Sequence, residues 1–233
     1  MPGRANLLLL PGLLCDSRLW AAQIDALSDI ANITVADLTR DETMEAMARR
    51  ALDNAPDLFA LAGLSMGGYA ALEIMRQAPR RVERLALLDT GARADTPEQT
   101  ARRRDLIALA DRGQFKAVSP RLLPLFVHPA RLDDERLVAA IQAMAGSVGK
   151  DAFLRQQKAI MDRRDSRPGL PDIRCDTVVI CGRQDVLTPL ELSEEIAALV
   201  PSSRLIVLEK CGHLSTMERP DEVTRALRDW LVG

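Results

Sequence analysis

The chain has 233 residues, enough for one domain or for one domain with an inserted subdomain. Apolar residues make up 47% of it and charged residues 27%, which is typical of a globular protein with a hydrophobic core. The formal charge of −2 gives no reason to expect binding to nucleic acid or to an anionic membrane surface.

The cysteines and the apolar runs indicate the compartment. No CxxC pair occurs, and with two histidines in the chain a zinc site is not expected. The apolar run near the start ends at Pro11-Gly12 without the small-residue cleavage site of a signal peptide. No run reaches the roughly 18 apolar residues that a membrane span needs. We therefore expect reduced thiols in a cytoplasmic protein. The cysteines are Cys15, Cys175, Cys181 and Cys211.

Six short apolar runs predict buried strands. Each run is apolar on both faces, which suits a parallel sheet covered by helices on each side. Helical patterns lie between the runs, so we expect a mostly parallel, doubly wound α/β domain with about six strands. The runs are Leu7 to Leu10, Ile33 to Ala36, Leu58 to Leu64, Leu85 to Leu88, Val178 to Cys181 and Leu205 to Leu208.

The first and last helical patterns are the clearest. Trp20, Ile24 and Leu27 share one face of a helix, and Asp16 or Ser17 is placed to cap its start. The last helix of the chain carries an apolar stripe at helical spacing. The stripe consists of Val223, Leu227, Trp230 and Leu231.

The alternation of strands and helices stops between Gly91 and Pro171, where no strand-like run occurs. About eighty residues are too many for a bare loop. We therefore expect a helical lid over residues 91–171, packed on a core domain formed by residues 1–90 and 172–233. The lid begins after a strand's carboxyl end, the edge where open α/β sheets bind ligands. Its predicted helices are 98–112, 114–120, 133–146 and 151–162.

The stretch Gly63-Leu64-Ser65-Met66-Gly67 fits the pattern G-x-S-x-G, with a predicted strand before it and a predicted helix after it. A serine on so sharp a turn has a strained backbone. Side chains two residues to either side would clash, and glycine at both places relieves the crowding. The N-terminal N–H groups of the following helix favour negative charge at the same place. We predict that Ser65 is a nucleophile.

A serine nucleophile needs a base, and His128 and His213 are the two candidates. His213 follows the last predicted strand, at the ligand-binding edge of the sheet, so we assign the base to His213. His128 lies in the predicted lid, where we expect a surface residue or a substrate contact.

The third member of the site should be a carboxylate that orients the imidazole of the base. Asp185 follows the strand that ends at Cys181 and lies at the same edge. Asp89, which directly follows another strand, is the rival. We favour Asp185 and expect Asp89 to be a polar strand-end residue or a neighbour of the triad.

An oxyanion hole needs two N–H donors. The backbone of Met66, immediately after the nucleophile, supplies one of them in this interpretation. The other should come from the loop after the first strand, Pro11-Gly12-Leu13-Leu14, and we assign it to Leu13 because Gly12 permits a close approach of the backbone.

Together these features resemble the α/β-hydrolase superfamily, specifically its small, lidded serine esterase-like members in the branch of esterases, enol-lactonases and carbon–carbon bond hydrolases. The resemblance covers essentially the whole chain. It implies the chain order Ser, Asp, His, which Ser65, Asp185 and His213 follow. Many relatives carry His-Gly where this chain has Pro11-Gly12, so the loop is expected to be held differently while the chemistry survives.

The prediction is a serine hydrolase of small carboxylic esters that works through a Ser-His-Asp triad and an acyl-enzyme, without metal or cofactor. We expect a small-molecule ester substrate, no nucleic-acid or membrane partner and a possible homodimer. Charged substrates would need an arginine, for which Arg18, Arg40 and Arg183 lie near the correct edge. The residues expected to line the substrate pocket are Leu14, Leu123, Phe126 and Leu214.

Three alternatives remain open at this point. The first is an enol-lactonase or carbon–carbon bond hydrolase, for which an arginine would have to meet a substrate carboxylate. The second is an acyl-thioester hydrolase. The third is a non-catalytic ligand receptor with the same fold, which the presence of all three triad residues disfavours.

Overall fold

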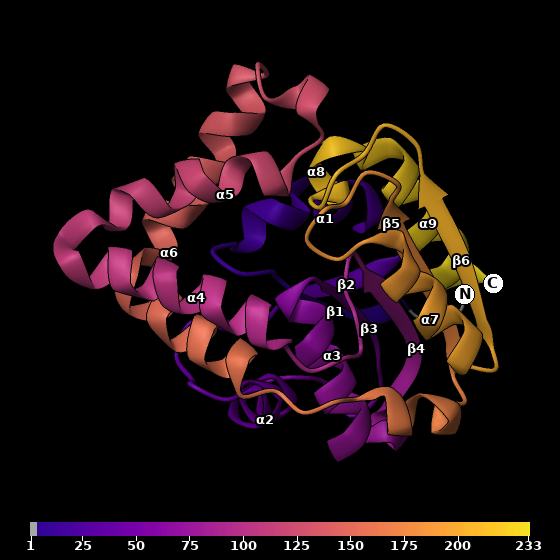
Figure 1. Ribbon diagram of the computed structural model, residues 1–233. Helices are drawn as coiled ribbons and strands as arrows, with labels where there is room; N and C mark the ends of the chain where they lie inside the picture. Colours follow the sequence, from indigo (N-terminus) through magenta and orange to yellow (C-terminus); the bar gives the residue numbers. More distant parts are fainter. Residues whose placement is uncertain (1–3) are drawn as a thin grey trace.

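The computed structural model describes residues 4–233 (Figure 1). All six predicted strands are present and form one parallel sheet in the order β2-β1-β3-β4-β5-β6. The predicted fold class, α/β with a parallel sheet and a helical insertion, is therefore confirmed. The strands are β1 (Ala5–Leu10), β2 (Ala31–Val35), β3 (Phe59–Leu64), β4 (Val82–Leu88), β5 (Asp176–Gly182) and β6 (Ser203–Leu208).

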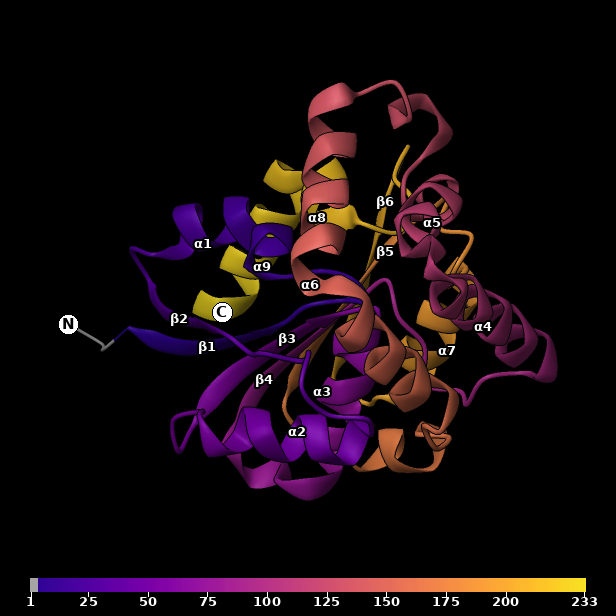
Figure 2. The ribbon, with the colours of Figure 1, turned by 90° about the vertical axis from the view of Figure 1, so that its left-hand side faces the viewer.

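Helices cover both faces of the sheet, which explains why the central strands are apolar on both sides (Figure 2). On one face, α1 packs against α9, and on the other, α2 packs against α3. The side chain of Asp16 caps the turn before α1 by accepting from the Arg18 N–H, as predicted. The helices of the core domain are α1 (Ala21–Leu27), α2 (Met44–Asp53), α3 (Met66–Gln77), α7 (Leu190–Leu199), α8 (Ser215–Glu218) and α9 (Pro220–Val232), with short 3₁₀ turns η1 (Ser17–Trp20) and η2 (Pro79–Arg81).

The insertion between β4 and β5 is helical and lies at the carboxyl-terminal edge of the sheet (Figure 1). Its last helix covers both of the helices predicted over 133–146 and 151–162, with a break at Gly149, where φ is 78° and ψ is 173°. The elements of the insertion are α4 (Pro97–Leu109), a π-helical turn η3 (Ala110–Gln114), η4 (Phe115–Ala117), α5 (Val118–Phe126), η5 (Pro129–Arg131), α6 (Glu135–Met161) and η6 (Arg167–Asp172).

The predicted helix over 114–120 was wrong in its bounds, since α5 runs from Val118 to Phe126. Pro124 lies inside α5 and lowers its helix propensity. Burial of Leu122 and Phe126 on one face of α5 stabilises the helix all the same, because tertiary packing outweighs local propensity.

Within residues 4–233, α6 is the one helix whose length and mean hydropathy suffice to cross a membrane, which the sequence analysis did not anticipate. A packed helix of a globular protein passes the same test, so the finding is weak evidence for a membrane span. The buried Gln156 of α6 forms hydrogen bonds with the backbone of Leu14 and Leu38 in the core domain.

Candidate active site

Ser65 occupies a strained turn between β3 and α3, with φ at 56° and ψ at −115°. The turn is closely packed. A Cβ atom added to Gly63 would lie 2.3 Å from the carbonyl oxygen of Gly67, and one added to Gly67 would lie 2.1 Å from that of Leu10. No side chain fits at either position, so the pattern G-x-S-x-G here reflects the steric crowding that the sequence predicted.

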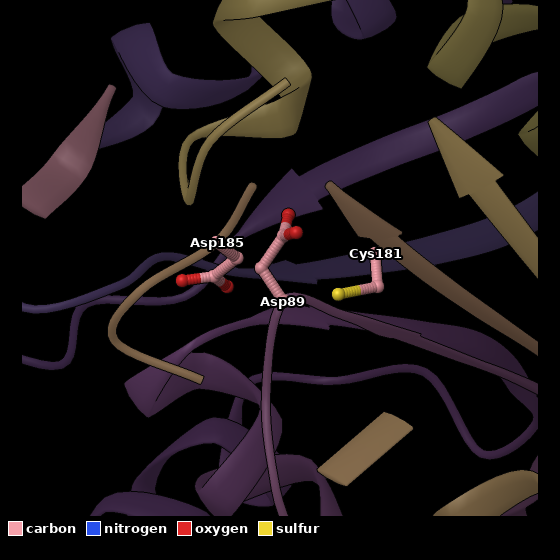
Figure 3. Close-up of side chains that lie close together, drawn as sticks. All are labelled: Asp89, Cys181 and Asp185. Atoms are coloured by element: carbon pink, nitrogen blue, oxygen red, sulfur yellow. The ribbon is translucent and has the colours of Figure 1, made fainter. Parts of the chain in front are cut away.

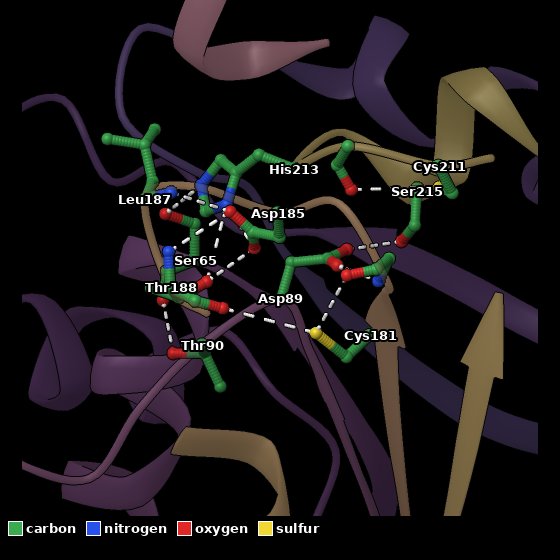
Figure 4. Close-up of polar contacts among 12 residues, drawn as sticks. Ser65, Asp89, Thr90, Cys181, Asp185, Leu187, Thr188, Cys211, His213 and Ser215 are labelled. Carbon is green, nitrogen blue, oxygen red and sulfur yellow. Dashed lines mark hydrogen bonds and ion pairs between the residues drawn. The ribbon is translucent and has the colours of Figure 1, made fainter. Parts of the chain in front are cut away.

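The structure brings Ser65, His213 and Asp185 together (Figure 4). The Nε2 atom of His213 lies 2.8 Å from Oγ of Ser65, and its Nδ1 atom lies 2.8 Å from Oδ2 of Asp185. His213 comes from the loop after β6, and Asp185 from the turn after β5. The hydroxyl, the imidazole and the carboxylate are therefore joined by two hydrogen bonds, the arrangement that lets a base take the proton of a serine.

The carboxylate of Asp185 is held in place by its own turn. Its Oδ1 accepts from the N–H groups of Leu187 (2.8 Å) and Thr188 (3.0 Å), and its Oδ2 accepts from the Thr188 hydroxyl (2.6 Å). Thr188 was missed in the sequence, although a threonine three residues after an aspartate is a common partner in such turns.

Opposing effects set the pKa values of the pair. Burial works to raise the pKa of Asp185, but the positive charge of His213 and the hydrogen bonds outweigh it, so the pKa lies below its usual value. Burial works to lower the pKa of His213. The charge of Asp185 and the hydrogen bond between the two side chains outweigh burial, so the pKa of His213 lies above its usual value. The imidazole is thus a stronger base than an ordinary histidine.

Asp89, the rival acid, lies beside Asp185 but forms no hydrogen bond with His213 in the described part of the chain. Its carboxyl group is buried after β4, accepts from the N–H of Gly182 (2.8 Å) and bonds the hydroxyl of Ser215 (Figure 4). Burial, and then the charge of Asp185, raise the pKa of Asp89 to about 8. Asp89 is therefore a protonated neighbour of the triad near neutral pH.

Asp89, Cys181 and Asp185 form a cluster whose possible metal ligands lie within 4.8 Å of one another (Figure 3). The donor chemistry fits a metal ion poorly. Both oxygens of Asp185 already accept hydrogen bonds, and Asp89 holds its proton. Burial raises the pKa of the Cys181 thiol, which disfavours the thiolate that a metal ion requires.

The loop after β1 lies against the nucleophile. A Cβ atom on Gly12 would be 3.5 Å from Cβ of Ser65, so the backbone of this loop approaches the elbow closely. The next residue, Leu13, lines the same pocket as Ser65, and Met66 begins α3. The N–H of Leu14 is already bonded to Oε1 of Gln156 (3.1 Å), so α6 holds the loop that contains Pro11-Gly12.

A pocket of about 90 Å³ opens on Ser65 and His213 beneath the lid. Of the four residues expected to line it, Phe126 does so. Leu14 and Leu214 are buried in the core instead, and Leu123 is partly buried and packs against the core without lining the pocket. The lining is Leu13, Ser65, Tyr69, Gln99, Arg102, Arg103, Leu106, Leu122, Leu125, Phe126, Gln157, Ile160, Leu187, Thr188 and His213.

None of the three arginines considered from the sequence lines the pocket. Each is paired with a nearby acid on the surface, namely Arg18 with Asp16, Arg40 with Asp37 and Arg183 with Glu209. The arginines of the pocket come from α4 in the lid, and no sequence signal pointed to them.

The lid is tied to the histidine loop by Glu218. Its carboxylate accepts from the N–H groups of Gly212 (2.9 Å) and His128 (2.7 Å). His128 itself uses Nδ1 to cap η5, by accepting from the N–H of Ala130 (3.1 Å), and it does not line the pocket.

Comparison with known proteins gives three informative relatives. A pimeloyl-[acyl-carrier protein] methyl ester esterase of Nitrosomonas europaea is 26% identical over an alignment that covers 93% of this chain and 92% of the relative. The structure of a thermophilic esterase from Thermogutta terrifontis, with malate bound, is 30% identical, with a TM-score of 0.89 over 98% of this chain and 90% of that one. The structure of an enol-lactonase from Burkholderia xenovorans LB400 shows the same fold. It is 24% identical, with a TM-score of 0.90 over 99% of this chain and 92% of that one.

The family comparison covers nearly the whole chain. Residues 7–226 match the model of the alpha/beta hydrolase family, a range that includes Ser65, Asp185 and His213. This match agrees with the parallel sheet, the helical insertion and the strained serine turn. The chain therefore belongs to the alpha/beta hydrolase family.

Proposed function

We propose that the protein is a serine hydrolase that cleaves small carboxylic esters through an acyl-enzyme. One observation carries the proposal: a serine on a strained turn lies 2.8 Å from an imidazole that a buried carboxylate holds. The names of two relatives, a methyl ester esterase and a thermophilic esterase, favour the ester among the bonds that this family cleaves.

The reaction follows from the geometry. Oγ of Ser65 attacks the ester carbonyl while Nε2 of His213 takes the serine proton, and Asp185 stabilises the imidazolium that forms. The backbone N–H groups of Leu13 and Met66 stabilise the oxyanion of the tetrahedral intermediate. His213 returns the proton to the leaving alcohol, and it then activates the water that hydrolyses the acyl-enzyme.

The size of the pocket favours a small ester as the substrate. Its volume of about 90 Å³ is well below the roughly 300 Å³ at which pockets for drug-sized ligands begin. Leucines from the lid form one wall, Leu106, Leu122 and Leu125, and they suit the short alkyl chain of an acyl group.

Labelling with a fluorophosphonate tests the proposal, together with turnover of p-nitrophenyl acetate and p-nitrophenyl butyrate. We expect the wild-type protein to be labelled and to hydrolyse both esters, and Ser65→Ala to lose labelling and turnover. A wild-type protein that melts cooperatively, yet is neither labelled nor active, would contradict the proposed function and favour the receptor alternative.

A further inference from the structure

The active-site pocket carries an excess of positive charge on one side. Arg102 and Arg103 of α4 line it, and no aspartate or glutamate does. Tyr69 from α3 and Gln157 from α6 lie in the same lining. The pocket therefore joins an apolar wall, which suits a short carbon chain, to a group of hydrogen-bond donors from three helices.

Arg103 is held rigidly on this side of the pocket. Its Nε donates to Oδ2 of Asp95 (2.6 Å), and its Nη1 donates to Oε1 of Gln157 (3.0 Å). The side chain of Asp95, 1% exposed, also accepts from Arg163, whose guanidinium lies over the ring of Tyr69 at 4.1 Å. One buried carboxylate thus faces two guanidinium groups, so a full positive charge beside the pocket has no partner.

Gln157 gives a second, independent indication of a ligand. Its side chain is fully buried, and its Nε2 has no hydrogen-bond acceptor in the described part of the chain. The hydrogen bond from Arg103 identifies the amide atom it reaches as Oε1, because only the oxygen of the amide can accept. The other amide atom is therefore the donor Nε2. A buried donor without an acceptor is unfavourable, which makes an acceptor on a bound molecule the natural partner.

A carboxylate on the bound molecule would satisfy both the unpaired positive charge and the unused N–H donor of Gln157. It brings a second negative charge to the group formed by Arg103, Arg163 and Asp95, and it accepts from Nε2 of Gln157. The Tyr69 hydroxyl, for which the structure gives no hydrogen bond among the described residues, is a third donor in the lining. Arg102, which is exposed on the same helix, adds to the positive potential at the mouth.

We propose that this pocket selects esters that carry a second, free carboxylate, and that Arg103 and Gln157 bind this carboxylate while Ser65 attacks the ester. The substrate class is the half-ester of a short dicarboxylic acid, or a lactone that bears a carboxylate. The inference rests on the proposed function for its reaction, but the binding of the carboxylate can be measured without it.

The deciding experiment is calorimetric titration of the Ser65→Ala protein with monomethyl glutarate and with methyl pentanoate, which share one carbon chain and differ in the free carboxylate. A charge-assisted bond to arginine predicts roughly 10- to 100-fold tighter binding of monomethyl glutarate. Arg103→Met, placed in the Ser65→Ala protein, should abolish the difference. Arg104→Met, on an exposed neighbour outside the pocket, should retain it. Equal binding of the two esters, or a difference that survives Arg103→Met, would overturn the inference.

Two further measurements keep the result unambiguous. Gln157→Met removes the amide while Arg103 keeps its pair with Asp95, so it should lower the preference for monomethyl glutarate even if Arg103→Met fails to fold. In the wild-type protein, kcat/KM for mono-p-nitrophenyl glutarate should exceed that for p-nitrophenyl pentanoate. Hydrolysis of the neutral ester without any preference for glutarate would refute the inference alone. Binding of monomethyl glutarate through Arg103 in a protein that is never labelled at Ser65 would refute the proposed function alone.

Discussion

The carbonyl oxygen of Phe126, the last residue of α5, accepts hydrogen bonds from the backbone N–H of His213 (3.1 Å) and of its neighbour Leu214 (2.9 Å). The ring of Phe126 also stacks on the imidazole of His213, with ring centres 6.1 Å apart and planes 15° from parallel. The lid therefore holds both the backbone and the ring of the proposed base, and its position affects the chemistry directly as well as access to the pocket.

Phe126→Leu should slow the reaction of Ser65 without abolishing it. The backbone hydrogen bonds survive, but the stacking that limits rotation of His213 is lost. Since aromatic pairs contribute about 0.5–1.5 kcal/mol, we expect a roughly 2- to 10-fold slower rate of fluorophosphonate labelling. Phe115→Leu is the matched control, because Phe115 pairs with Phe153 in the lid but does not line the pocket. An equal slowing in both variants would show that the effect comes from the lid as a whole.

Asp185→Asn should lower kcat/KM by roughly three to four orders of magnitude, since the imidazole loses the group that orients and stabilises it. It should also move the acidic limb of the pH profile. In the wild-type protein this limb lies above pH 6.5, because Asp185 outweighs the effect of burial and raises the pKa of His213. Without that charge, burial prevails and the limb moves to lower pH. A larger loss in Asp89→Asn than in Asp185→Asn would show that Asp89 is the acid of the triad.

Asp89→Asn should change the dependence of stability on pH. In the folded protein Asp89 keeps its proton up to about pH 8, whereas in the unfolded chain it loses the proton near pH 3.8. Between these values the folded state binds more protons, so the free energy of unfolding contributed by this group falls as the pH rises. Asparagine does not titrate. Urea unfolding at pH 5 and pH 8 should therefore show the variant gaining stability relative to the wild type at the higher pH, and a constant difference would argue against a protonated Asp89.

Gly67→Ala should destabilise the fold by at least about 2 kcal/mol, because the new methyl group would overlap the carbonyl oxygen of Leu10. Gly146→Ala, inside α6 with open space around it, is the opposite case and should stabilise by about 0.5–1 kcal/mol. Thermal unfolding of the two variants measures both effects. Similar shifts in the two variants would mean that the turn at Ser65 relaxes more easily than its packing indicates.

The sheet and the three proposed catalytic residues could be predicted because their signals are local. Buried strands are apolar on both faces, and residues that follow parallel strands meet at one edge, which places Ser65, Asp185 and His213 together. The polar side of the pocket could not be predicted in this way. Arg103 and Gln157 lie on two lid helices 54 residues apart, and their contact depends on how α4 and α6 pack over the sheet. Helical periodicity marks the buried face of each helix but does not say which residues of the two faces meet.

The hydrogen bond between Ser65 and His213 joins residues that are 148 positions apart in the chain. It needs β3 with its turn, β5 with Asp185, and β6 with the loop that follows it, all docked in one sheet. Parallel pairings of such sequence separation form slowly, because a long loop must close before any contact is gained. During refolding, helical circular dichroism should therefore recover before fluorophosphonate labelling of Ser65 does. The labelling of Ser65 should then mark the last step of assembly, and the proposed catalytic centre would report that folding is complete.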